Sequence, residues 1–323
     1  MEHTPDYSNP ESAAGRSDSA SPLTNCELCP RRCRADRTNG RLGYCRTDVS
    51  LCISSVVKHS GEEPVISGTR GICNVFFAHC NLQCRFCQNH QISRNEHDLG
   101  PWRRELPDVV GHIERLLDKG AHGVGFVSPS HMIPQMKSII NALTDRGRRP
   151  VYVYNSNGYD CPRALASLEG LIDIFLPDFK YADEQLARLY SDAPEYPEVA
   201  LAAVKEMFRQ TGPDLALDDH GVARSGLIIR HLVLPGQVAN SKGVLRLIAD
   251  EISTDVHLSL MAQYYPTSAV KNDPNLGRRL TVEEYDDVLE EFDRLGFHRG
   301  WTQQLSSAEH YRPDFESETP FET

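Results

Sequence analysis

The segment Cys80-Asn81-Leu82-Gln83-Cys84-Arg85-Phe86-Cys87 brings three cysteines close together, directly after an apolar run over residues 72–78. Three thiolates at these spacings can hold three irons of a cuboidal iron-sulfur cluster, but they leave the fourth iron without a protein ligand. An open iron can bind a small molecule. The spacing therefore indicates a site that does chemistry.

Two other uses of these cysteines remain open on spacing alone. A tetrahedral zinc site would need a fourth ligand, which His79 or His90 can supply, and free thiols are also common in protein cores. The preceding strand, the loop and the aromatic Phe86 favour the cluster. A disulfide framework is disfavoured, because the chain is long and we expect it to carry no secretory signal segment.

With Phe86 at its aromatic position, the motif C-x-x-x-C-x-aromatic-C resembles that of the radical S-adenosylmethionine (radical SAM) superfamily. The resemblance implies a 4Fe-4S cluster on Cys80, Cys84 and Cys87, with the amino and carboxylate groups of S-adenosylmethionine on the open iron. It also implies that one electron cleaves the sulfonium to methionine and a 5'-deoxyadenosyl radical. The protein positions and shields the cofactor that does this chemistry.

A second cysteine group lies nearer the N-terminus, in the stretch CELCPRRCRADRTNGRLGYC. Its four thiols are enough to close a metal site, and the turn between Gly40 and Gly43 can bring the last one back to the other three. Spacing does not decide between a second 4Fe-4S cluster and a zinc ion, and packed reduced thiols are the alternative without metal. The predicted ligands are Cys26, Cys29, Cys33 and Cys45.

Composition limits the class of protein. The chain has 323 residues, of which 40% are hydrophobic, enough for one substantial core or two modest ones. No apolar run approaches a membrane span, and we expect a cytoplasmic protein. The formal net charge of -11 argues against nucleic acid as a partner. We interpret the one dense basic run as a solvated loop around a metal site: Arg31, Arg32, Arg34 and Arg37.

Four segments are predicted along the chain. Residues 1–24 are rich in Ser, Pro, Asp and Glu, and we expect a disordered leader. Residues 25–65 form a cysteine-rich metal-binding extension, residues 66–300 the radical SAM core, and residues 301–323 a C-terminal tail.

The core reads as alternating strands and helices, which predicts an α/β fold with a parallel sheet. The predicted strands are 72–78, 123–127, 151–154, 172–176, 227–234 and 257–262. The predicted helices are 107–119, 133–146, 162–169, 183–190, 197–210, 241–252 and 281–295. Six strand-and-helix units match the partial (β/α)6 TIM-like barrel of radical SAM enzymes, here with a cysteine-rich N-terminal extension.

Polar residues follow the predicted strands or, in the case of Arg230, lie within one, and the carboxyl ends of parallel strands in a barrel share one face. S-adenosylmethionine has an amino group, a carboxylate and a ribose diol, which these side chains can satisfy. Each also has a structural alternative, such as a turn, a helix cap or an ion pair. The predicted cofactor-binding residues are Phe86, Ser128, Ser130, His131, Asn155, Asp178, Lys180 and Arg230.

The sequence departs from much of the superfamily after the second strand. The Gly-Gly-Glu motif that holds the amino group in that family is replaced here by Ser128-Pro129-Ser130-His131. The ligand of the amino group is therefore left unassigned.

Longer segments resemble a narrower group, an uncharacterised branch related to pyruvate formate-lyase activating enzymes. They are GEEPVISG from Gly61, LPDFKYAD from Leu176, IRHLVLPG from Ile229 and MAQYYP from Met261. This resemblance implies that Asp178, Lys180 and Arg230 contact the cofactor, with a monovalent cation near Asp178.

Three functions are compatible with these features. The first is hydrogen abstraction by a radical SAM oxidoreductase from a glycine of a partner protein, with a cellular electron donor. The second is a radical SAM methyltransferase or maturase of a peptide or small molecule, in which a cluster on the N-terminal cysteines transfers electrons or binds substrate. The third is a non-enzymatic iron-sulfur electron carrier, against which the open iron argues.

Overall fold

The structure is a computed structural model that describes residues 21–309, 312–317 and 320–321. Apart from its last four residues, the predicted leader lies outside this part of the chain.

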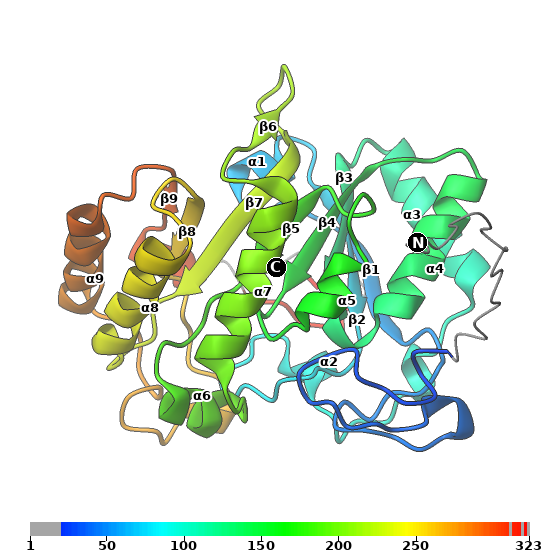
Figure 1. The fold of residues 1–323 in the computed structure, drawn as a ribbon, viewed down its shortest axis with the longest axis horizontal. Coiled ribbons are helices and arrows are strands. Elements are labelled where there is room, and N and C mark those ends of the chain that lie inside the picture. The colour runs from blue at the N-terminus through cyan, green and yellow to red at the C-terminus, as the bar shows by residue number, and fades with distance from the viewer. Residues whose placement is uncertain (1–20, 310–311, 318–319, 322–323) are drawn as a thin grey trace, which may run out of the picture.

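A curved parallel sheet forms the centre of the molecule, and its strands follow one another in space in the order of the sequence (Figure 1). Every strand of the predicted parallel set is present, so the predicted partial barrel with six strand-and-helix units is confirmed. The set is β2 (Ile72–Phe77), β3 (Gly123–Val127), β4 (Val151–Ser156), β5 (Ile174–Pro177), β7 (Ala223–Leu232) and β8 (His257–Met261).

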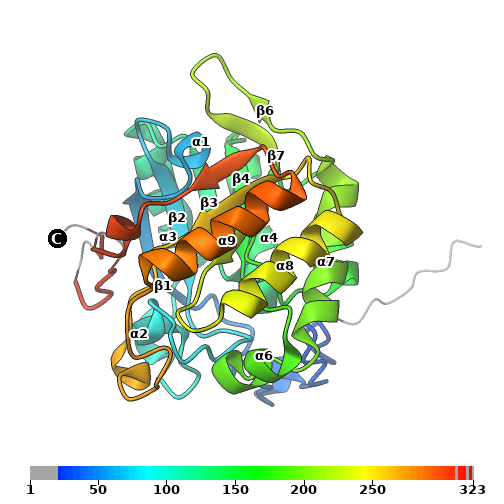
Figure 2. The same cartoon turned by 90° about the vertical axis from the view of Figure 1, so that its left-hand side faces the viewer.

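The longer helices return the chain between these strands and cover the outer face of the sheet. Figure 2 shows α7, α8 and α9 side by side over that face. These helices are α3 (Leu106–Asp118), α4 (Ile133–Asp145), α5 (Pro162–Ala166), α6 (Glu184–Ser191), α7 (Tyr196–Thr211), α8 (Val238–Glu251) and α9 (Val282–Leu295). None of the helices among the described residues combines the length and apolar character needed to cross a bilayer.

The edges of the sheet hold elements that sequence patterning did not predict. β1 (Ile53–His59) pairs antiparallel with β2, so that His59 lies opposite Ile72, the first residue of β2. Short α1 (Pro64–Ser67) follows β1, and the hairpin strand β6 (Ala216–Leu217) pairs with β7. At the other edge β9 (Gly300–Thr302) runs parallel to β8. Thus β1 lies within the predicted extension, and β9 spans the predicted boundary at residue 300.

Apolar side chains fill the space between the sheet and the helices. All six residues of β2 and all five of β3 are buried, as expected for parallel strands that are covered on both faces. On α3 the buried positions are Val109, Val110 and Ile113, the face that the spacing of apolar residues predicted.

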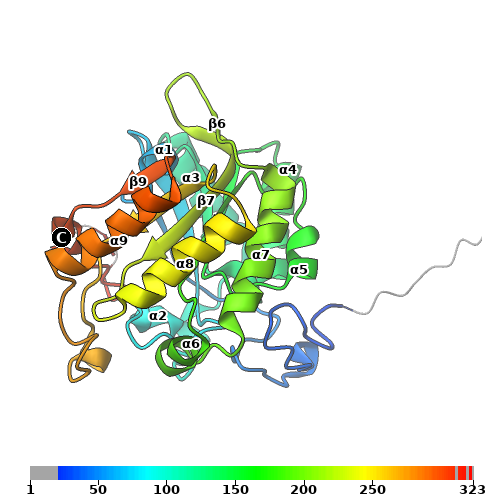
Figure 3. The ribbon, with the colours of Figure 1, turned by 60° about the vertical axis from the view of Figure 1, so that its left-hand side comes forward.

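The loops at the carboxyl ends of the strands gather at one end of the molecule. Figure 3 shows α2 (His90–Ser93), α6 and the N-terminal segment at this end. Several hydrogen bonds join the cysteine loop to its neighbours at this end; among them, Gln83 N donates to Ser191 O at 3.1 Å, and Arg31 Nε donates to Asn81 O at 2.9 Å. The two predicted cysteine groups therefore lie at the same end.

The C-terminal segment packs against the β1 and β2 edge. The ring of Phe321 lies 4.2 Å from that of His59, and the ring of Phe315 lies 5.1 Å from that of Phe76. Gln91 Nε2 donates to Asp314 Oδ1 at 2.9 Å. Residues predicted as a tail thus form part of the wall around the inside of the sheet.

Candidate radical SAM active site

Cys80, Cys84 and Cys87 lie in the loop that leaves β2, at the carboxyl end of the sheet. The chain turns sharply at His79, whose φ of 64° lies in the left-handed region. The buried His79 ring contacts two carbonyl groups that fix this turn, Cys45 O at 2.9 Å and His97 O at 3.1 Å. The strand end and this turn together set the direction of the cysteine loop.

Each of the three sulfurs has a donor from another element. Asn157 Nδ2 donates to Cys80 Sγ at 3.3 Å. The hydroxyls that end two helices serve the others: Ser191 Oγ donates to Cys84 Sγ at 3.0 Å, and Ser93 Oγ donates to Cys87 Sγ at 3.3 Å. Hydrogen bonds to sulfur are one of the means by which a protein sets the potential of an iron-sulfur cluster. The donor set therefore suits such a cluster.

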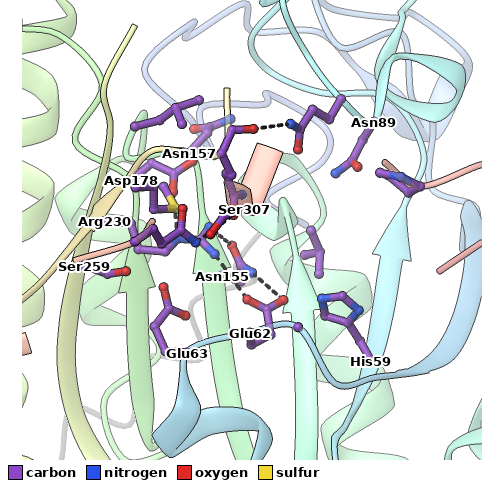
Figure 4. A pocket seen from close by; sticks show the side chains of 18 of the residues that line it. His59, Glu62, Glu63, Asn89, Asn155, Asn157, Asp178, Arg230, Ser259 and Ser307 are labelled. Carbon is purple, nitrogen blue, oxygen red and sulfur yellow. Dashed lines mark hydrogen bonds and ion pairs between the residues drawn. The ribbon is translucent and has the colours of Figure 1, made fainter. Parts of the chain in front are cut away.

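A cavity of about 580 Å³ lies on the inner side of the sheet and reaches the cysteine loop. Cys84 and Cys87 line it, whereas Cys80 is buried behind Asn157. The structure brings most of the predicted cofactor-binding residues together around this cavity (Figure 4). Those that line it are Phe86, Ser128, Asn155, Asp178, Lys180 and Arg230.

A charged network centres on Asp178. Its carboxylate accepts from Arg230 Nε at 2.8 Å and is also paired with Lys180. Burial alone would raise the pKa of Asp178, but the charges of Arg230 and Lys180 outweigh burial and hold that pKa below its usual range. Arg230 Nη2 donates to Asn155 Oδ1 at 2.6 Å. The predicted convergence of Asp178, Lys180 and Arg230 is therefore present as a folded ion network.

Two acidic residues at this cavity were not predicted as site residues. Glu62 Oε1 accepts from Asn74 Nδ2 at 2.9 Å, and Glu62 Oε2 pairs with Arg230 Nη1 at 3.3 Å. Glu63 also lines the cavity and is buried. Both come from the turn between β1 and α1, and the quoted segment GEEPVISG was the signal in the sequence that could have marked them.

Ser130 and His131 do not line the cavity. Both are 1% exposed in the turn after β3, and His131 Nε2 lies 3.0 Å from Ala78 O. Burial lowers the pKa of His131 to about 3, so the ring is neutral at pH 7. The outward-pointing neighbour of Arg230 on β7, His231, is likewise buried and has a pKa lowered by burial to about 4. Alternate residues of a strand face opposite sides, which separates His231 from Arg230.

Ser128 and Phe86 take different places in the wall. Ser128 has a φ of 54° and directly follows β3 at the cavity. Phe86 packs on Tyr264, with 6.1 Å between ring centroids. Its position next to Cys87 makes it part of the apolar cover over the cysteine loop.

The four N-terminal cysteines are gathered by their short loop. Cys29 interacts electrostatically with the other three thiols, and burial as the largest cause raises its pKa well above the ordinary value. Gly43 permits the close approach, since a Cβ atom there would lie 2.2 Å from Cys33 Sγ. Cys26, Cys29 and Cys45 are buried and Cys33 is exposed.

Neither cysteine set is arranged as a single-ion site. Among the described residues, no group of three or more His, Cys, Asp and Glu side chains is positioned to hold one metal ion.

Arg31 and Arg37 tie the N-terminal segment to the sheet rather than leaving a solvated basic loop. Arg31 donates to Asn81 O, next to Cys80, and its guanidinium lies 3.6 Å from the centroid of the Tyr44 ring. Arg37 is 1% exposed and donates to His131 O at 2.7 Å and Asp48 O at 2.7 Å. The interpretation of these two arginines as solvated residues was wrong, because backbone carbonyls and an aromatic ring bury them.

Comparison with known sequences places this cavity and its cysteine loop in a defined class. The sequence model of the radical SAM superfamily matches residues 74–248, more than half of the chain. The chain therefore belongs to the radical SAM superfamily and is a radical SAM enzyme. It is 30% identical over 275 residues to the uncharacterized protein MJ0674 of Methanocaldococcus jannaschii, covering 82% of this chain and 73% of that protein.

Three solved structures with a similar fold share little sequence identity with this chain. A domain of pyruvate-formate lyase-activating enzyme from Bacteroides vulgatus ATCC 8482 is 13% identical, with a TM-score of 0.40 over 57% of this chain and 100% of that chain. Methylornithine synthase PylB is 13% identical, with a TM-score of 0.47 over 68% of this chain and 62% of that chain. HydG from Carboxydothermus hydrogenoformans is 12% identical, with a TM-score of 0.45 over 69% of this chain and 51% of that chain. Such similarity carries no argument about the reaction.

Membership in the superfamily implies a 4Fe-4S cluster and S-adenosylmethionine, and the residues present fit both groups. Cys80, Cys84 and Cys87 would hold the cluster, which supplies the electron for cleavage of S-adenosylmethionine. The adjoining cavity offers Asp178, Lys180, Arg230 and Asn155 to the polar groups of the cofactor.

Proposed function

We propose that this protein reductively cleaves S-adenosylmethionine and uses the resulting 5'-deoxyadenosyl radical to abstract hydrogen, with a glycine of a partner protein as the leading substrate. The observation that carries the proposal is the shared cavity. It joins Cys84 and Cys87 to the ion network of Asp178, Lys180 and Arg230.

The side chains of the cavity have distinct tasks in this proposal. Lys180 and Arg230 would donate to the carboxylate of the cofactor, and Asp178 would accept from its amino or hydroxyl groups, with a monovalent cation nearby. Asn155 holds Arg230 in place through the bond to its Nη2. Phe86 and Tyr264 keep water from the cysteine loop. A buried, pre-arranged network reduces the reorganisation that the cofactor would otherwise demand.

The products formed from S-adenosylmethionine test this function. The protein is reconstituted with iron and sulfide without oxygen, then given dithionite and S-adenosylmethionine, and the nucleosides are quantified by chromatography. Hydrogen abstraction predicts 5'-deoxyadenosine as the main nucleoside product. S-adenosylhomocysteine as the main product would favour the methyltransferase alternative, and no consumption of cofactor by fully loaded protein, even with candidate partners, would favour an electron carrier.

For the N-terminal cysteines we propose a second 4Fe-4S cluster close to the radical site. Zinc, the alternative that the spacing leaves open, is disfavoured because these thiols are not positioned around a single ion. The Arg31 bond to Asn81 O and the His79 contact with Cys45 O support this arrangement, because both link the N-terminal segment to the residues beside Cys80. If the second site handles electrons or substrate, Cys29→Ala leaves uncoupled cleavage of S-adenosylmethionine intact while product formation fails.

The Cys29→Ala measurement compares 5'-deoxyadenosine with substrate-derived product per folded molecule. Cleavage and product formation that both stay near the parent values, with a lower yield of folded protein, would contradict a role in electron or substrate handling and leave a structural metal. Cys161→Ala is the matched control, because Cys161 is half-buried and lies outside both cysteine groups.

A further inference from the structure

The inner end of the cavity lies far from the cysteine loop. His59 is opposite Ile72 at the start of β2, whereas Cys80 follows the end of β2 at Phe77. At about 3.3 Å per residue, these two ends are roughly 16 to 20 Å apart. Residues at both ends line the same cavity, so a molecule bound there can extend from the cofactor to this inner end. We call the inner end, formed by His59, Glu62, Glu63 and Ser259, the acidic floor (Figure 4).

Two residues of the acidic floor have incomplete hydrogen bonding, His59 at Nδ1 and Glu63 at Oε2, and Glu63 is the one that carries a carboxyl group. Glu63 is 8% exposed, and its Oε2 atom has no hydrogen-bond partner among the described residues. Ser259 interacts with the same carboxyl group. A buried carboxyl oxygen without a partner is costly, and such atoms in folded proteins call for a specific explanation.

The nearest cation, Arg230, is already bound to side chains other than Glu63. Arg230 uses its Nε, Nη1 and Nη2 atoms for Asp178, Glu62 and Asn155 respectively. Lys180 pairs with Asp178. No ion pair joins Glu63 to a basic residue among the described residues, so acceptor capacity at the acidic floor exceeds the donors around it.

The other floor residues add no positive charge. Burial lowers the pKa of His59, which keeps its ring neutral, and the ring packs against Phe321. Glu62 is a second carboxyl group beside Glu63. Burial, as the largest cause, raises the pKa of Glu63, and the opposing charge of Arg230, which forms no ion pair with Glu63, does not cancel this effect.

We propose that the acidic floor binds a protonated amine or guanidinium group of the substrate, with Glu63 as its anchor. The inference rests on the proposed function, since it names the substrate class that the same cavity accepts. An N–H donor from such a group satisfies Glu63 Oε2 and supplies the missing positive charge. Met261 and Trp301, which also line the cavity, provide apolar surface for an aliphatic stem.

Isothermal titration calorimetry of the full chain, anaerobically reconstituted and supplied with S-adenosylmethionine, tests this proposal with paired probes. N-acetyl-lysine amide is compared with N-acetyl-norleucine amide, which lacks only the amine, and n-butylamine is compared with n-butanol. Because a hydrogen bond to a charged group is the stronger kind, we expect at least about tenfold tighter binding of the cationic member. Equal affinities within either pair that binds would overturn the proposal without any variant.

Glu63→Gln keeps the shape of the side chain and removes its charge. We expect this variant to lose the preference for the cationic probe, whereas Glu198→Gln, at an exposed position on α7, keeps it. A preference that survives in folded Glu63→Gln protein would overturn the assignment. Circular dichroism verifies that the variant folds. If it does not fold, the comparison of probes in the parent protein tests the proposal.

The same samples separate this inference from the proposed function. Cation binding that depends on Glu63, in protein that never releases 5'-deoxyadenosine, would contradict the proposed function and support the cation site at the acidic floor. Cleavage of S-adenosylmethionine without a preference for cationic probes would support the proposed function and contradict the cation site. Tighter binding of the lysine amide than of n-butylamine would identify a peptide side chain as the source of the cation, and the opposite order a free amine.

Discussion

Replacing Cys84 with alanine is expected to abolish 5'-deoxyadenosine formation. Cys84 lines the cavity, accepts a hydrogen bond from Ser191 and lies near the positive charge of Lys180. Two thiolates cannot replace three in holding a cluster with one open iron, so the variant should lose both bound cluster and cleavage. Iron and sulfide content, electron paramagnetic resonance and chromatography of the nucleosides measure the two losses separately.

The control for this experiment is Cys161→Ala, reconstituted in parallel. It removes a thiol without touching either cysteine group, and we expect cleavage close to that of the parent protein. Cleavage by Cys84→Ala protein above about a tenth of the parent rate would contradict the assignment of Cys84 as a cluster ligand. A loss in Cys161→Ala of the same size would show that general damage to folding explains both results.

Asp178→Asn is expected to be the most destabilising single exchange in the cavity. The side chains of Asp178, Lys180 and Arg230 are only 16, 16 and 14% exposed, and the exchange leaves two cations beside a neutral amide. Removal of one partner from a buried charge network costs about 3 kcal/mol or more in the free energy of unfolding. Urea denaturation at pH 7.5 measures the difference.

The contrast is Asp287→Asn at an exposed ion pair. Asp287 pairs with Lys242 at 2.5 Å on the outer surface, where its side chain is 50% exposed. An exposed pair contributes about 1 kcal/mol or less, so this variant should unfold close to the parent protein. Equal destabilisation by the two exchanges would contradict a special role for the Asp178 network.

The pH dependence follows from the lowered pKa of Asp178. Since the folded-state pKa lies below the unfolded value, the network adds stability above the unfolded pKa of about 3.9, and that contribution is lost as the pH falls through the folded-state value. The destabilisation caused by Asp178→Asn should therefore shrink as the solution becomes strongly acidic.

Much of the parallel sheet could be predicted from the sequence because its strands are continuous apolar runs between turn residues. The strand Gly123–Val127 was predicted with the bounds that the structure has. β1 was not predicted, because Ser54, Ser55 and Lys58 interrupt its apolar pattern and only some of its positions are buried. Its place in the sheet depends on pairing with β2, which local patterning cannot reveal.

Residues of the candidate site could be predicted where they directly follow a strand. The thiols, Asp178 and Lys180 obey that rule, and Arg230 lies near the carboxyl end of its strand. Glu62 and Glu63 do not, because they reach the cavity from the turn at the opposite end of the sheet, and Ser191 and Ser93 reach the thiols from the last residues of helices. Such approaches depend on tertiary packing, which the chain forms only after its strands and helices are in place.

The packing of the C-terminal segment against β1 and β2 has a consequence for the order of events during synthesis. Phe321 and Gln303 line the same cavity as His59 and Cys84, so residues from both ends of the chain build one wall. The ribosome synthesises the cysteine loop long before it synthesises Phe321. The wall of the cavity is therefore incomplete while the later residues are being made, and the cysteine loop is more accessible during synthesis than in the folded protein.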